Sequence, residues 1–140
     1  MIVLDTNVIS EFARPVPMEQ VAAWARLQNS AEFCTTTITE AELFAGVAAL
    51  PTGRRQTELS RAYEVILGSL GGRIFAFDRR AAREYALLVE QRRRVGRRTD
   101  TADGQIAAIA RLHEASIATR NVDDFADTGL RVLNPWTVRL

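Results

Sequence analysis

Two kinds of segment alternate along the chain when apolar and polar positions are compared. Short continuous apolar runs are typical of buried strands in a parallel sheet. They occur at residues 2–4, 32–36, 73–77, 116–120 and 130–134. Longer segments repeat apolar residues at intervals of three and four, which predicts helices. These lie at residues 8–12, 19–27, 39–49, 52–70, 79–95 and 101–114. Strands separated by helices predict an α/β fold, a three-layer α/β/α sandwich with a central parallel sheet.

The composition is that of an ordinary globular protein. Its 140 residues, 47% hydrophobic and 25% charged, suit one domain spanning residues 1–140. No apolar run approaches the ~18 residues of a membrane helix. Asp5 interrupts the first apolar run before a signal-peptide core can form. We therefore expect a soluble, cytoplasmic protein with no membrane partner. The single cysteine, Cys34, excludes an intrachain disulfide, and its apolar neighbours predict a buried thiol.

Two residue types are scarce, and this excludes several chemistries. The only histidine, His113, follows a helical segment and is expected to be structural, so a His–His ribonuclease and a His-ligated zinc site are excluded. The chain has no lysine, which excludes a P-loop and Schiff-base chemistry. All 18 basic residues are arginines, and the net charge is only +1. Arginines concentrate at 53–55 and 92–98, either as solvated faces or as a rim that contacts phosphates.

Acidic residues recur where strands end and helices begin. Asp5 ends the first strand, and Asp123 and Asp124 follow the fourth. Glu42 and Asp103 are expected in the first turns of the third and sixth helices. In a parallel sheet these positions gather at one edge.

Each acid also has a local, purely structural interpretation. Asp5 is a favoured helix N-cap residue. Thr39 and Glu42 have the spacing of a capping box, and Asp100 can cap the helix that contains Asp103.

A metal site accounts better for the acids taken together. Clustered carboxylates raise one another's pKa unless a cation neutralises them. With no lysine and one histidine available, a divalent ion is the natural partner. Oxygen ligands favour magnesium or manganese over zinc.

Four stretches of the chain resemble the PIN-domain family, in particular the VapC-like and FitB-like toxins of bacterial toxin–antitoxin pairs. They are "IVLDTNVISE", "ITEAELFAG", "DTADGQIAAIARLHEASIATRNVDDF" and "LRVLNPW", in the order the family has them. The resemblance covers nearly the whole chain. It implies a metal-dependent endoribonuclease with clustered carboxylates.

The same resemblance assigns residues to the expected site. Asp5 matches the first acid of the family, Glu42 the second and Asp103 the third. Some relatives have a fourth acid where Asn121 stands, whereas others carry it in the "DF" pair, here Asp124. Whether Asn121, Asp124 or a water between them completes the site stays open.

The implied roles follow from phosphodiester hydrolysis by an activated water. Asp5 and Asp103 would bind the first Mg²⁺ or Mn²⁺, and Glu42 and Asp124 would bind a second ion or orient water. The hydroxyl of Thr6 and the amide of Asn121 would support the acids or the phosphate that is cleaved. Without a histidine pair for attack by the 2′-hydroxyl, the products would carry a 5′-phosphate and a 3′-hydroxyl.

The family also implies partners. The substrate would be RNA, often a structured one such as transfer or ribosomal RNA. A VapB-like antitoxin would lay the apolar face of a helix in a groove and direct an arginine towards the acids. A homodimer is expected as well. The apolar positions 59–67, Phe12, Trp24, Phe44 and Leu50 are candidates for these interfaces because they exceed what one core needs.

Three other functions remain as alternatives. A receiver-like, magnesium-binding regulatory domain would need a lysine beside the acids. A phosphatase with an aspartyl nucleophile would need Asp-x-Asp, whereas Asn7 stands at the second position. A PIN-like module that has lost its activity would act only as a binding partner. Glu11 is expected to lie outside the acid cluster and to serve as a control position.

Overall fold

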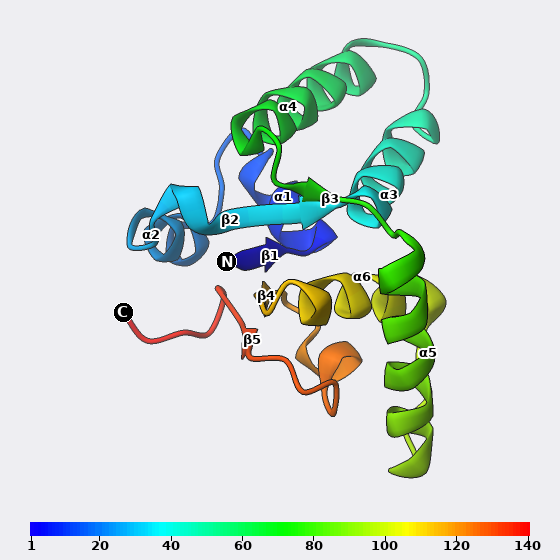
Figure 1. Cartoon of the computed structure of the whole chain (residues 1–140). Coiled ribbons are helices and arrows are strands. Elements are labelled where there is room, and N and C mark those ends of the chain that lie inside the picture. The colour runs from blue at the N-terminus through cyan, green and yellow to red at the C-terminus, as the bar shows by residue number, and fades with distance from the viewer.

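The computed structural model describes residues 1–140 and has a parallel five-stranded sheet at its centre (Figure 1). The strand order is β3-β2-β1-β4-β5. The strands are β1 (Ile2–Leu4), β2 (Phe33–Thr36), β3 (Ile74–Phe75), β4 (Ser116–Ala118) and β5 (Val132–Leu133). The helices are α1 (Thr6–Phe12), α2 (Glu19–Arg26), α3 (Thr37–Ala48), α4 (Arg54–Leu70), α5 (Arg79–Arg94) and α6 (Thr101–Leu112). Two 3₁₀ helices, η1 (Ser30–Glu32) and η2 (Val122–Phe125), complete the elements.

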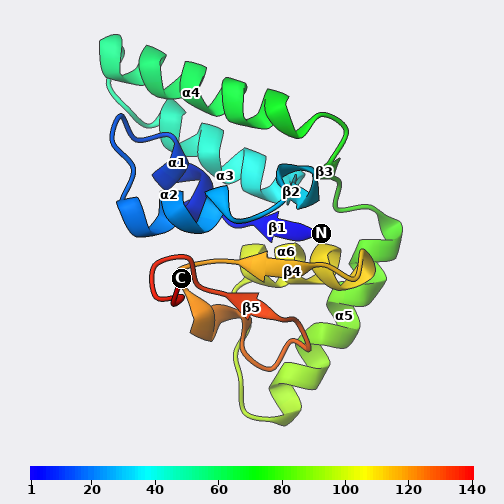
Figure 2. The ribbon, with the colours of Figure 1, turned by 90° about the vertical axis from the view of Figure 1, so that its left-hand side faces the viewer.

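The predicted α/β fold with a parallel central sheet is confirmed. Successive residues of β1 point to opposite faces of the sheet, as the pleat of a strand requires. Leu4 packs in a core with α1 to α4, whereas Val3 packs in a second core with α5, α6 and η2. In Figures 1 and 2, α4 and α5 accordingly lie on opposite sides of the molecule. Both faces of β1 are covered, which explains why its residues are uniformly apolar.

β1 has its predicted length, whereas the other strands are shorter than the sequence predicted because each needs a neighbour. β1 ends at Leu4, where α1 follows, so β4 has no partner on that side beyond Ala118. β2 ends at Thr36, and β3 therefore pairs only through its two residues. All six helices are present with ends shifted by a few residues. An apolar run in the sequence thus marks a strand but does not fix its length.

The connections reverse direction at β1. From this central strand the chain builds β2 and β3 on one side and β4 and β5 on the other. In open parallel sheets ligands bind at such a switch point, outside the carboxyl ends of the strands. Asp5 directly follows β1 and Thr119 directly follows β4, and their backbones are joined to the sheet at this edge.

Cys34 and His113 are structural, as expected. Cys34 is buried in β2, and burial raises the pKa of its thiol to about 11. His113 follows α6 and stacks on Phe75, with ring centroids 3.9 Å apart. No helix has both the length and the apolar character needed to cross a membrane.

Candidate active site

A hollow of about 650 Å³ lies at the carboxyl ends of the strands, and we call it the acid pocket. Three of the predicted acids, Asp5, Glu42 and Asp103, line it together. Its other lining residues are Thr6, Asn7, Ser10, Glu11, Arg14, Arg55, Arg120, Asn121 and Trp136. Residues distant in the sequence therefore meet at the switch point of the sheet.

Asp5 has both of the roles considered for it, helix cap and pocket residue. Its Oδ1 accepts a hydrogen bond from the backbone N–H of Thr6 at 2.8 Å, which caps α1. Its Oδ2 accepts from the Thr119 hydroxyl at 2.7 Å and from the Asn7 amide at 3.3 Å. Burial raises the pKa of this carboxyl, while these hydrogen bonds act in the opposite direction. The carboxylate is thereby held in one orientation.

Glu42 is in the second turn of α3, not the first, and the expected capping box is wrong. The helix begins at Thr37 because Thr36 is its N-cap and accepts from the backbone N–H of Thr39 at 3.0 Å. Glu42 is thus free of the cap. Its Oε1 accepts a hydrogen bond from the Thr6 hydroxyl at 2.9 Å. Thr6 therefore orients the second acid.

Asp103 is in the first turn of α6, as predicted. Asp100 caps this helix and accepts from the backbone N–H of Asp103 at 3.3 Å, so its capping role is also correct. The pKa of the Asp103 carboxyl is raised to about 7, chiefly by burial and then by the negative charges of the other site acids, Asp5 foremost. The acids therefore repel one another at this edge.

Asn121 and Asp124 differ in position. Asn121 lines the acid pocket, and its backbone N–H donates to the Thr119 hydroxyl at 3.1 Å. Asp124 lies on η2 and lines a smaller hollow, which it shares with Asn121. Its charge nevertheless raises the pKa of both Asp5 and Asp103. Asp124 is thus at the margin of the acid pocket.

Sequence reasoning missed several residues of the pocket. Thr119 is fully buried and bonds to Asp5, from which it is 114 residues distant along the chain. Asn7 donates to both, although its place in the Asp-Thr-Asn triplet was a usable clue. The expectation for Glu11 is wrong, because it lines the pocket. It also accepts from the backbone N–H of Met18 at 2.7 Å, which fixes the turn after α1.

The two arginine-rich stretches differ in what they contact. Arg55, from the first stretch, lines the acid pocket and forms no ion pair. Arg120 also lines it, with its guanidinium carbon 5.3 Å from the centre of the Trp136 ring. In the second stretch, Arg93 and Arg94 pair with Glu90 on a solvated face. Arg55 is thus the one arginine of the two stretches that lines the acid pocket, and a phosphate-contacting rim stays a prediction.

The donor atoms of the pocket fit a divalent cation. Asp5, Glu42, Asp103 and Asp124 take part in no ion pair, whereas Glu11, the remaining acid of the pocket, pairs with Arg14. The mutual repulsion of the unpaired acids is a cost that a cation would remove. No three His, Cys, Asp or Glu side chains are placed so that they could hold one ion directly. An ion here would therefore be bound by one or two carboxylates and by water, as Mg²⁺ commonly is.

Comparison with known proteins gives consistent matches over nearly the whole chain. The PIN domain pattern matches residues 2–130. The "VapC ribonuclease Y4jK" of Sinorhizobium fredii is 43% identical over 137 residues, 97% of this chain and 98% of that protein. "Toxin FitB" of Neisseria gonorrhoeae is 41% identical over 97% of this chain and 99% of its own length. The crystal structure of FitAcB from the same organism superposes with a TM-score of 0.91 at 40% identity, covering 99% of this chain and 100% of that one.

Proposed function

The chain belongs to the PIN-domain family, and from this premise we propose that it is a Mg²⁺- or Mn²⁺-dependent endoribonuclease, the toxin of a toxin–antitoxin pair. The resemblance carried by the four sequence stretches is thereby confirmed. The observation that carries the proposed activity is the convergence of Asp5, Glu42 and Asp103, none of them paired with a cation, in one pocket open to solvent.

Each acid has a distinct role in the proposed reaction. Asp5 and Asp103 bind the ion, which when bound supplies charge neutralisation at the phosphodiester and a more acidic water. Asp5 is preorganised for this by Thr119, and the raised pKa of Asp103 marks the carboxylate that gains most from a cation. Glu42, held by Thr6, and Asp124, at the margin, orient water. The products carry a 5′-phosphate and a 3′-hydroxyl.

The arginines of the pocket are suited to hold an RNA backbone. Arg55 and Arg120 reach the pocket from opposite parts of the sequence, and neither forms an ion pair with an acid of the chain. Guanidinium groups bind phosphate oxygens through paired N–H donors. We infer that they hold the phosphates on either side of the one that is cleaved.

A cleavage assay on total RNA tests the activity. The wild-type protein should cleave RNA with Mg²⁺ or Mn²⁺ and lose the activity in EDTA. Asp5→Asn should be inactive, whereas Glu64→Gln, on the exposed face of α4 and outside the pocket, should cleave normally. A folded wild-type protein that cleaves no RNA with either metal would favour the inactive binding module. Equal cleavage by Asp5→Asn would refute the acid site.

The antitoxin partner is supported by a second hollow of about 340 Å³ between α1 and α4. Ala13, Pro15 and Leu59 give it apolar walls, and it shares Ser10, Arg14 and Arg55 with the acid pocket. A helix seated there by its apolar face would lie directly beside the acids, and an arginine from it would reach them. The similarity of this chain to Toxin FitB and to the FitAcB structure supports a partner of this class.

A further inference from the structure

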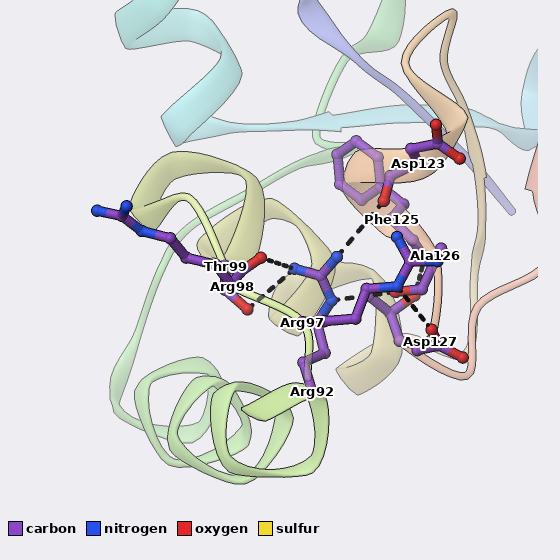
Figure 3. Close-up of polar contacts among 9 residues, drawn as sticks. Arg92, Arg97, Arg98, Thr99, Asp123, Phe125, Ala126 and Asp127 are labelled. Atoms are coloured by element: carbon purple, nitrogen blue, oxygen red, sulfur yellow. Dashed lines mark hydrogen bonds and ion pairs between the residues drawn. The ribbon is translucent and has the colours of Figure 1, made fainter. Parts of the chain in front are cut away.

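Arg92 is a buried arginine that the proposed reaction does not use. It lies in the last turn of α5 and is only 2% exposed, although it belongs to a stretch whose other arginines face solvent. Figure 3 shows its guanidinium enclosed between the segment before α6 and the segment around η2. Burying an arginine is costly unless its donors find acceptors, so its contacts identify what the side chain holds together.

Every hydrogen bond of the guanidinium is to an oxygen of one of these two segments. Nε donates to the carbonyl of Ala126 at 3.0 Å. One terminal nitrogen donates to the carbonyl of Arg98 and to the hydroxyl of Thr99, both at 2.9 Å, and the other donates to the carbonyl of Asp123 at 3.4 Å. No carboxylate pairs with Arg92. Its charge is thus satisfied by backbone and hydroxyl oxygens, and it joins two loops.

Each of these loops leads directly to a site acid. Thr99 precedes the N-cap of α6, whose first turn carries Asp103. The carbonyls of Asp123 and Ala126 flank Asp124 on η2. One planar guanidinium therefore holds both the backbone that leads to Asp103 and the backbone around Asp124. A lysine could not do the same, because its donors radiate from one atom and do not form a flat fork.

Gly104 transmits the position of Thr99 to the start of α6. A Cβ at Gly104 would lie 2.6 Å from Cγ2 of Thr99 and 2.8 Å from Cε2 of Tyr85, so the helix start is in close contact with the segment that Arg92 holds. A displacement of Thr99 would therefore displace the residue next to Asp103.

We propose that Arg92 is a positioning residue, which sets the separation of Asp103 and Asp124 by joining the segments that carry them. The proposal rests on the proposed function only in that these two acids act in cleavage. Arg92 is remote from the substrate, so its loss should change the rate of the chemical step and leave the binding of RNA unchanged.

The test compares Arg92→Met and Arg92→Lys with Arg111→Met. Arg111 is the matched control because it is an arginine largely shielded from solvent that joins α6 to α5, by an ion pair with Glu84 at 2.8 Å. Its loss should lower stability without touching either loop. Hydrogen–deuterium exchange is measured on full-length protein in EDTA. The values of kcat and KM are measured with a fluorescent RNA oligonucleotide that the wild type cleaves.

Arg92→Met should lower kcat by about 10- to 100-fold, the usual effect of a displacement near 1 Å, with KM within about twofold of wild type. Arg92→Lys should recover part of kcat. Exchange should increase at residues 97–104 and 122–127 together. Arg111→Met should keep kcat within about twofold of wild type, even if its melting temperature falls as much as that of Arg92→Met.

Two results would overturn the proposal. In one, the Arg92 variants match Arg111→Met in kcat at equal loss of stability. In the other, exchange increases in one of the two segments only. Should Arg92→Met fail to fold, Arg92→Lys alone decides by the same criteria. If the wild type cleaves no RNA, the proposed function fails, and the exchange data still decide whether Arg92 joins the two segments.

Discussion

Asp103 shows how one carboxyl group can make stability depend on pH. Burial and the neighbouring acids raise its pKa from 3.8 to about 7, so the folded protein binds this proton more tightly than the unfolded chain does. The free energy of unfolding of the metal-free protein should therefore decrease as the pH rises from about 4 to about 7. Below this window the carboxyl is protonated in both states and has no effect.

Asp103→Asn should remove this destabilisation. Because Asp103 is half-buried, solvent screens part of the repulsion, and we expect a gain of about 1 kcal/mol at pH 8. In a domain of this size that gain raises the melting temperature by about 3–6 °C. Melting curves in EDTA at pH 8 and pH 3.5 check this, since the two proteins should melt alike at the lower pH. A variant less stable than wild type at pH 8 would mean that the carboxylate is a structural cap.

Asp5→Asn should behave differently, because Asp5 is engaged by three donors. The amide oxygen can keep the cap on α1, but the new NH₂ group would face two donors, the hydroxyl of Thr119 and the NH₂ group of Asn7. Relief of repulsion and loss of these bonds should nearly cancel, leaving stability within about 1 kcal/mol of wild type. RNA cleavage should fall at least ~100-fold because an ion ligand is lost. Circular dichroism melts and cleavage rates on one preparation measure both, and an unfolded variant would contradict the expectation.

At the scale of elements, the start of α6 depends on a close approach that only glycine permits. Gly104 is buried against Thr99 and Tyr85, whereas Gly68, on the exposed face of α4, has no neighbouring atom in the path of a Cβ. The two positions form a matched pair, since both are helical and neither has a positive φ.

Gly104→Ala should destabilise the protein by about 1–3 kcal/mol through overpacking. It should also reduce cleavage, because the displaced turn carries Asp103. Gly68→Ala should instead stabilise by about 0.5 kcal/mol, as alanine is the better helix former. Urea denaturation of both variants gives the sign directly. A Gly104→Ala variant as stable as wild type would show that Thr99 and Tyr85 yield easily.

At the scale of the molecule, metal binding should be visible as stabilisation, since a ligand that binds only the folded state raises its stability. With a Kd on the order of 1 mM, about 10 mM Mg²⁺ should add roughly 1.4 kcal/mol, or about 3–6 °C in melting temperature. Mn²⁺ should add at least as much. Asp103→Asn should lose most of the shift, and Glu64→Gln should keep it. Equal shifts in all proteins would place the ions elsewhere on the surface.

The protein is also expected to form a homodimer. Most of the apolar positions assigned to interfaces are used by the core instead: Trp24 is buried, and Phe12, Phe44 and Leu59 pack against the same cluster. The large apolar side chains that remain exposed include Val65 on α4 and Leu87 on α5. Light scattering at tens of micromolar should give the mass of a dimer. Substitution of Val65 or Leu87 by aspartate then identifies the face, and a strict monomer would contradict the prediction.

The sequence by itself determined the kinds of element and the places where acids emerge from them. Periodicity and helix caps act over a few residues, so the strand ending at Leu4, the helix capped by Asp100 and the acids beside them could be predicted without a structure. The order of these segments along the chain was also enough to indicate the family.

Only the tertiary structure decided how these pieces meet. The bond from Thr119 to Asp5, the raised pKa of Asp103 and the burial of Arg92 in an otherwise solvated run of arginines all depend on residues distant in the chain. The limits of β3 and β4 were likewise set by where their neighbours end. Contacts of this kind arise when helices pack on both faces of the sheet, and no local pattern records them because the same residues would be exposed if the packing differed.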